Sequence, residues 1–106
     1  MDKTEVLTII DSFRKRLEFS GIQVEKIILF GSYAHGTDHS GSDIDLVVIS
    51  NGFEQLDFWQ RIELIADAIF QVMKPIEAVP MTLKEWESGD SFISSYAANG
   101  ETVYAA

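Results

Sequence analysis

Two carboxylates and a glycine–serine corner stand ten residues apart in the first half of the chain, each beside an apolar run. Side chains alternate across a strand, so Asp43 and Asp45 would point to one face while Ile44 points to the other. Two carboxylates on one face can hold Mg²⁺, a hard ion that prefers oxygen ligands and shares its coordination shell with substrate phosphates. The acids therefore suggest a metal site, and Gly31 and Ser32 suggest a phosphate group as its second ligand.

The corner has the residue types that bind phosphate. Gly31 lets the backbone turn tightly and approach a ligand closely. If a helical turn opens at Ser32, its first N–H groups form an anion site, and the serine hydroxyl can donate to the same phosphate. Two like charges as close as Asp43 and Asp45 would otherwise repel, so a bound cation resolves their repulsion. Together these residues predict a site for a metal-bound phosphate.

The same residues also fit an ordinary loop. Ser40-Gly41-Ser42-Asp43 is typical turn composition, and an isolated Asp-x-Asp pair is common. The complete arrangement is far more specific than either part, because apolar strands flank it at both ends. That specificity favours the phosphate and metal site over the loop.

The segment from Phe30 to Asp45 resembles the signature of the nucleotidyltransferase superfamily with the polymerase-β-like fold. The short chain is similar to the minimal nucleotidyltransferase (MNT) branch, whose members are often encoded beside a helical HEPN partner as toxin–antitoxin pairs. The resemblance implies an α/β (α+β) fold, with a small mixed sheet flanked by helices, as a single nucleotidyltransferase domain over residues 1–106. It gives His35 no role, because family members commonly carry an arginine there.

The resemblance also implies a role for each site residue. Asp43 and Asp45 would hold Mg²⁺ or Mn²⁺ on the triphosphate of an NTP, with ATP as the expected donor, and Gly31 and Ser32 would bind its phosphates. The family uses a third acid on the strand after the long helix, where this sequence has Glu77. Glu77 would complete the metal site or accept the proton of the attacking hydroxyl. The open alternative is that Glu77 simply faces outward from its strand.

Composition limits the classes of partner and location. A chain of 106 residues with 46% hydrophobic and 24% charged residues is typical of one globular domain. The net charge of −9 and the lack of a Lys/Arg stripe disfavour nucleic acid as the main partner. No cysteine is present, so thiolate metal sites are excluded. Without a signal segment or a membrane-length apolar run, we expect a cytoplasmic protein with no membrane contact.

Hydrophobic periodicity and turn residues predict alternating helices and strands. The predicted helices cover residues 2–20, 54–73, 82–86 and 90–98, and the predicted strands cover 24–30, 45–50, 75–81 and 102–104. A short helix is expected at the start of the loop after Phe30. Prolines at both ends of the third strand indicate an exposed edge.

The longest predicted helix has an apolar face that we expect to meet the core, and a leucine on its other side. The face comprises Phe58, Ile62, Ile65/Ala66, Ile69 and Met73. Leu64 falls among polar residues, as an isolated exposed leucine or as part of a partner-binding surface. The aromatic residues expected in the core or at its edge are Trp59, Trp86, Tyr96 and Tyr104. Tyr33 is left open between stacking on a base and packing, and His35 and His39 are expected to be solvent-exposed.

The residues and the resemblance together favour an enzyme that transfers a nucleoside monophosphate, AMP from ATP, to a hydroxyl group. The predicted elements use nearly the whole chain, so a partner is expected to bring the acceptor, and the acidic surface favours a protein. The resemblance makes a HEPN-type toxin that partner, with a tyrosine hydroxyl as acceptor and this chain as antitoxin. The alternative is a non-catalytic antitoxin or subunit that neutralises its partner by binding. Homo-oligomers are possible in either case.

Overall fold

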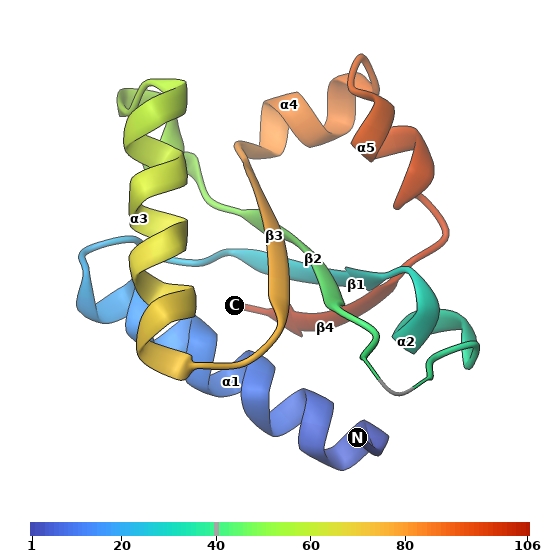
Figure 1. Ribbon diagram of the computed structural model, residues 1–106. Helices are drawn as coiled ribbons and strands as arrows, with labels where there is room; N and C mark the ends of the chain where they lie inside the picture. Colours follow the sequence, from blue (N-terminus) through green and yellow to red (C-terminus); the bar gives the residue numbers. More distant parts are fainter. Residues whose placement is uncertain (40) are drawn as a thin grey trace.

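The computed structural model describes residues 1–39 and 41–106, so Ser40 of the predicted turn lies outside the described residues. Helices and strands alternate along the chain, much as the periodicity predicts (Figure 1). The helical elements are α1 (Lys3–Phe19), α2 (Ser32–His35), the 3₁₀ helix η1 (Asn51–Gln55), α3 (Phe58–Val72), α4 (Leu83–Ser88) and α5 (Phe92–Tyr96). The strands are β1 (Lys26–Phe30), β2 (Ile44–Ile49), β3 (Ile76–Met81) and β4 (Glu101–Ala105).

The described strands form one mixed sheet in the order β3-β2-β1-β4. β1 is antiparallel to β2 and to β4, whereas β2 and β3 are parallel. Parallel neighbours need a crossover connection, and α3 supplies it between β2 and β3 (Figure 1). This arrangement confirms the predicted small mixed sheet flanked by helices, and it places β3 at an edge, as its prolines indicate.

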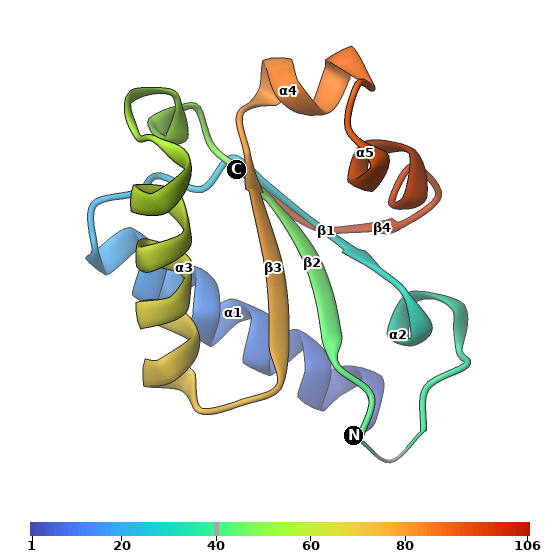
Figure 2. The same cartoon turned by 45° about the horizontal axis from the view of Figure 1, so that its top comes forward.

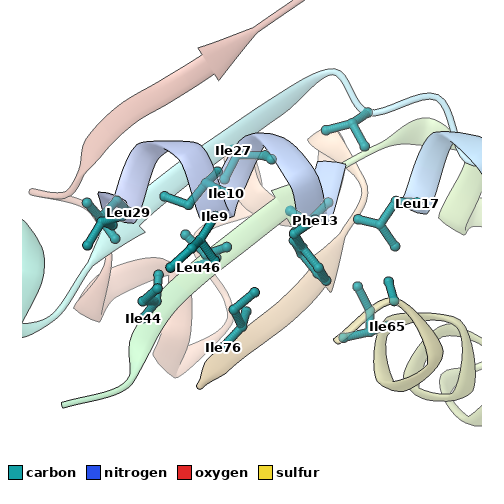
Figure 3. Close-up of a cluster of buried hydrophobic side chains, with 14 of the residues drawn as sticks. Ile9, Ile10, Phe13, Leu17, Ile27, Leu29, Ile44, Leu46, Ile65 and Ile76 are labelled. Carbon is teal, nitrogen blue, oxygen red and sulfur yellow. The ribbon is translucent and has the colours of Figure 1, made fainter. Parts of the chain in front are cut away.

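Helices cover both faces of the sheet. α1 and α3 pack on one face, whereas α4 and α5 lie on the other (Figure 2). Phe13 and Leu17 of α1 meet Leu29, Leu46 and strand neighbours in the larger core, which Figure 3 shows together with Ile65 of α3. Because both faces are covered, the central strands are continuous apolar runs rather than alternating ones.

The predicted core face of the long helix is only partly right. Ile65 is buried and Ile69 packs against the core, as predicted, whereas Phe58 and Met73 are 64% and 81% exposed. Outside the predicted face, Ala68 is buried and Leu64 packs half-buried against the core. The helix therefore docks with its Leu64–Ala68 side turned toward the core, and both ends of the predicted face lie in solvent.

Two aromatic residues that were expected in or beside the core are also exposed. Trp59 on α3 is 74% exposed, and Tyr96 on α5 is 61% exposed. Trp86 and Tyr104 are partly buried at the core edge, as predicted. Within residues 1–39 and 41–106, no helix combines the length and apolar character that a membrane span requires.

Local capping explains where several elements begin. Asp57 caps α3 through a capping box with Gln60, so the predicted 54–73 helix is divided between η1 and α3. Thr82 forms a capping box with Glu85 at α4. Ser91 caps α5, so this helix begins later than the predicted start at residue 90.

The last strand enters the sheet beside Gly100. A Cβ atom at this position would lie 2.6 Å from the carbonyl oxygen of Leu29 and 2.8 Å from a methyl carbon of Ile28. Only glycine therefore lets the backbone approach β1 this closely. α5 lies immediately before this contact, so the pairing of β4 with β1 fixes one end of α5.

Candidate active site

The glycine–serine corner lies directly against one of the two aspartates. β1 ends at Phe30, which pairs with Asp45 of β2, and Gly31 follows with φ 73° and ψ −154°. L-residues rarely adopt this backbone conformation. A Cβ atom at Gly31 would also overlap Oδ2 of Asp45. Both the turn and the approach of the carboxylate therefore require glycine.

The expected helical turn after Gly31 is present as α2, beside β1 and β2 (Figures 1 and 2). The N–H groups of Ala34 and His35 donate to the carbonyl oxygen of Gly31 at 3.1 and 3.3 Å. The first N–H groups of such a turn have no partner within it, so they can serve an anion. Ser32 opens the turn, so its hydroxyl belongs to the same turn.

The loop before β2 is held by two hydrogen bonds. The N–H of His39 donates to the hydroxyl oxygen of Ser42 at 2.9 Å, and the N–H of Ser42 donates to the carbonyl oxygen of His39 at 3.0 Å. Ile44 then joins the sheet by donating to the carbonyl oxygen of Pro75 at 2.8 Å. These bonds fix Asp43, the residue between them, immediately before β2.

Two of the three predicted acids, Asp45 and Glu77, lie on the same side of the sheet. Phe30, Asp45 and Glu77 are direct register partners on β1, β2 and β3, so their side chains form one row. The carboxyl groups of Asp45 and Glu77 are within hydrogen-bonding distance, and the charge of Asp43 acts on Asp45. The structure thus brings Asp45 and Glu77 together beside Gly31, with Asp43 near enough for its charge to act on Asp45.

The acids are electrostatically strained without a cation. Partial burial raises the pKa of Asp45 to about 6, and the negative charge and hydrogen bond of Glu77 and the charge of Asp43 add to the effect. A proton on Asp45 relieves this repulsion. A bound cation would relieve it equally well and would displace the proton.

The donor set fits a hard divalent ion that is shared with a substrate. Among residues 1–39 and 41–106, no group of three or more His, Asp or Glu side chains forms a ready-made metal cage. Mg²⁺ is usually held by one or two carboxylates and completed by substrate phosphates and water. Carboxylates also suit Mn²⁺. Asp45 with its acidic neighbours fits such an ion once a triphosphate lies on α2.

A cavity of about 320 Å³ opens beside the acids, between α5 and the sheet. Asp45 and Glu77 line one side, and Phe92 and Tyr96 of α5 line the other. The rings of Phe92 and Tyr96 are stacked with centroids 6.1 Å apart, and Tyr96 meets Phe30 edge to face at 5.7 Å. Phe92 is not among the residues that the sequence singles out, and Tyr96 was expected in the core. Their spacing of four residues on a short helix was the available signal.

The exposure of Tyr33, His35 and His39 decides between the two interpretations left open for Tyr33 and tests the expectation for the histidines. Tyr33 is 8% exposed and belongs to the core, so packing rather than stacking on a base accounts for it. His35 and His39 are exposed, as expected of loop histidines. The phosphate corner and the acids are thus the part of the site that sequence reasoning identified.

A model of the nucleotidyltransferase domain family matches residues 9–98. Among solved structures, a proposed nucleotidyltransferase from Sulfolobus solfataricus aligns with a TM-score of 0.73 and 16% identity, over 96% of this chain and 82% of that one. A toxin–antitoxin complex with AMP-PNP aligns with a TM-score of 0.63 and 25% identity, over 94% and 73% of the two chains.

A further similar structure is a tri-AMPylated Shewanella oneidensis HEPN toxin in complex with its MNT antitoxin. It aligns with a TM-score of 0.57 and 21% identity, over 100% of this chain and 74% of that one. At 16% and 21% identity these likenesses establish the fold. No curated protein matches the chain.

Proposed function

Because this chain belongs to the nucleotidyltransferase domain family, we propose that it transfers AMP from ATP to a hydroxyl group of a HEPN-type partner protein, as the antitoxin of a toxin–antitoxin pair. The observation that carries the proposal is the contact between the corner and the acids. Gly31 lies against the carboxylate of Asp45, and Glu77 reaches the same carboxylate from the next strand. A phosphate on α2 would therefore lie within reach of the acids.

Each residue has a distinct task in the proposed reaction. The turn at Gly31 and the hydroxyl of Ser32 bind and orient the phosphates of ATP. Asp45, with Asp43 and Glu77, would hold Mg²⁺, which neutralises the charge that develops on the phosphates. Glu77 lies at the cavity, where it can accept the proton of the attacking hydroxyl. Positioning and charge neutralisation account for most of such catalysis.

Two observations support the proposal that the acceptor hydroxyl belongs to a protein. The net charge of −9 favours a basic protein over a nucleic acid, because it repels phosphate backbones. The similar structures include toxin–antitoxin complexes, one of them with AMP-PNP and another with a tri-AMPylated toxin. These support the partner class, and they make AMP the natural group to test first.

The test is label transfer within a co-expressed complex. The chain and its HEPN-type partner are incubated with Mg²⁺ and ATP that is labelled at the α-phosphate. Asp43→Asn with Asp45→Asn should lower labelling of the partner at least about a hundredfold, because transition-state charge loses its compensation. Asp38→Asn in the same loop is the control for loss of a nearby negative charge outside the acid cluster. Equal labelling by the double variant, with the complex intact, contradicts the proposal.

A non-catalytic antitoxin is the second candidate, and the outer surface of α3 favours it. Phe58, Trp59, Phe70 and Met73 are between 64% and 81% exposed, which is unusual for large apolar side chains. If binding alone neutralises the partner, the Asp43→Asn/Asp45→Asn variant will protect cells as well as the wild type. Loss of protection with an intact complex supports the enzyme instead.

A further inference from the structure

The outer surface of α3 carries a stripe of apolar side chains that the chain itself leaves largely uncovered. Trp59, Phe70 and Met73 are 74%, 75% and 81% exposed, and Phe58 extends the stripe by meeting Trp59 edge to face. α3 lies at the outside of the molecule in both views (Figures 1 and 2). The α3 stripe comprises Trp59, Ile62, Ala66, Phe70 and Met73.

The α3 stripe has the same spacing when it is read in either direction. Its members are separated by 3, 4, 4 and 3 positions, so Ala66 stands at the centre. Residues three or four apart are neighbours on a helix surface, and these members therefore share one side of α3. The buried Ile65 and Ala68 belong to the side that packs into the core. A stripe with this symmetry matches itself when two copies of the helix run antiparallel about a two-fold axis.

An antiparallel pair centred on Ala66 brings complementary side chains together. The two Ala66 side chains would meet on the axis, and their small size lets the helices approach closely. Trp59 would lie opposite Met73 of the second copy, which places an aromatic ring against a polarisable thioether. Ile62 would lie opposite Phe70 in the same way. The large side chains of each copy thus fall on both sides of a small central residue.

The ends of α3 carry opposite charges that the same pairing brings together. Asp57 precedes the helix, Lys74 follows its last turn, and both residues are exposed. In an antiparallel pair each Asp57 would lie beside Lys74 of the second copy, and the two helix dipoles would oppose each other favourably. A basic helix from another protein would need none of this symmetry. The symmetry therefore favours a second copy of this chain as the occupant.

We propose that the α3 stripe is the interface of a homodimer in which two α3 helices pack antiparallel about Ala66. Phe and Trp side chains bury about 150–250 Å² each, so the exposed rings, together with Met73, provide on the order of 500 Å² per copy. Two copies would bury on the order of 1,000 Å², which is the lower end for a specific interface. We therefore expect a dissociation constant in the micromolar range.

The dimer is independent of the proposed reaction. α3 packs on the face of the sheet opposite to α4 and α5, so the second copy would not cover the cavity beside Asp45 and Glu77 (Figure 2). Failure of label transfer would thus leave the dimer standing, and a monomeric chain would leave the proposed reaction standing.

A charge on the two-fold axis is the sharpest test. Sedimentation velocity of the intact chain over about 1–500 μM should show a monomer–dimer equilibrium. Ala66→Glu places two like charges on the axis, so it should raise the dimer Kd at least about tenfold. Gln71→Glu is the matched control, because it makes the same change of charge at an exposed position on another side of α3. Its Kd should stay within about twofold of the wild type. Both substitutions suit a helix, and thermal melting by circular dichroism checks that each variant is folded.

Salt dependence separates a second copy from a basic partner. Two chains of net charge −9 repel each other, and salt screens this repulsion, so the dimer should tighten as the ionic strength rises. A basic helix on the same stripe would bind more weakly under these conditions. A dimer that dissociates as salt is added would be held by ion pairs and would contradict the inference.

Cysteine cross-linking tests the orientation, because the chain contains no cysteine of its own. Ala66→Cys should form a disulfide-linked dimer on mild oxidation, since the two positions meet on the axis, whereas Gln71→Cys should not. Phe58→Cys and Lys74→Cys should be joined by a short bismaleimide when the two variants are mixed, and much less when either is alone. Parallel helices would give the reverse and would refute the arrangement.

Three further results would overturn the proposal. One is a wild-type chain that stays monomeric at every concentration. Another is a dimer that Ala66→Glu leaves as tight as the wild type. The third is a monomeric chain whose complex with a HEPN-type partner is lost in Ala66→Glu and kept in Gln71→Glu. That outcome would assign the α3 stripe to the partner protein, as the non-catalytic antitoxin considered above requires.

Discussion

Replacing Asp45 by asparagine tests the electrostatics of the acid cluster. The pKa of Asp45 is raised from its ordinary value of 3.8 to about 6, because of burial and the charges of Glu77 and Asp43. A pKa difference of one corresponds to about 1.4 kcal/mol, so a fully buried group would contribute about 3 kcal/mol. Asp45 is only partly buried, and solvent screening reduces the expected effect to about 1–2 kcal/mol.

The sign follows from which state holds the proton more tightly. The folded protein keeps the Asp45 proton to a higher pH than the unfolded chain does. This contribution to the free energy of unfolding is fully present below about pH 4 and is lost as the pH rises through about 6. An asparagine side chain cannot ionise, so the Asp45→Asn variant does not lose this stability as the pH rises. Without metal, it should be more stable than the wild type by about 1–2 kcal/mol near pH 7.

Urea denaturation in EDTA from about pH 4 to pH 8 measures this difference, with a corresponding rise in Tm of about 4–8 °C per kcal/mol. The comparison of wild type and variant isolates Asp45 from the other carboxylates that titrate in this range. Asp38→Asn controls for the loss of one negative charge. Mg²⁺ with AMP-PNP should stabilise the wild type and have little effect on Asp45→Asn, because ligands stabilise only the state that binds them.

Two results would refute this reasoning. The first is an Asp45→Asn protein that is less stable than the wild type near pH 7 without metal. The second is a stability difference between the two proteins that does not change between about pH 4 and pH 6. Either would mean that the acids are not held in mutual repulsion, and their electrostatics would then give no reason for a cation between them.

Three further substitutions probe the turn at Gly31, the partly buried Arg61 and the core. Gly31→Ala should abolish label transfer and lower the free energy of unfolding, measured by urea denaturation, by about 1–3 kcal/mol, because the added Cβ atom would overlap Asp45 Oδ2. Unchanged label transfer would contradict the close contact between Gly31 and Asp45. Arg61→Ala should lower the free energy of unfolding by about 1–3 kcal/mol, because the guanidinium donates to the carbonyl oxygens of Phe53 and Leu56 and pairs with Glu85 at 2.8 Å. If high salt removes the whole difference between variant and wild type, only the ion pair matters. Phe13→Ala should cost about 3–5 kcal/mol by the same assay, because this fully buried ring leaves a cavity; a loss below about 1 kcal/mol would mean that the core collapses around it.

The sequence is most informative where local chemistry decides the structure. Gly31 and Ser32 could be placed on a tight turn, and alternation put Asp43 and Asp45 on one face before any fold was known. The pairing of Thr82 with Glu85 likewise needs only local spacing. The catalytic roles of Gly31, Ser32 and the acids stay predictions, whereas the pairing of Asp45 with Glu77 follows from the β2–β3 register.

Tertiary docking accounts for what the sequence could not show. The apolar arc of α3 permits two orientations, and only the shape of α1 and the sheet selects the one that buries Ile65 and exposes Phe58. Periodicity alone identifies an apolar face without saying which part of it meets the core. Phe92 was not singled out and Tyr96 was expected in the core or at its edge for a related reason, because their place beside the acids depends on how β4 returns to the sheet.

The close approach at Gly100 has a consequence for how such a protein can diverge. The turn at Gly31 is built from the first half of the chain, whereas the side of the cavity formed by Phe92 and Tyr96 is positioned by the strand that follows Gly100. The two sides of the cavity therefore come from segments that can vary separately. Substitutions near the C-terminal strand can reshape the cavity while the turn at Gly31 stays as it was.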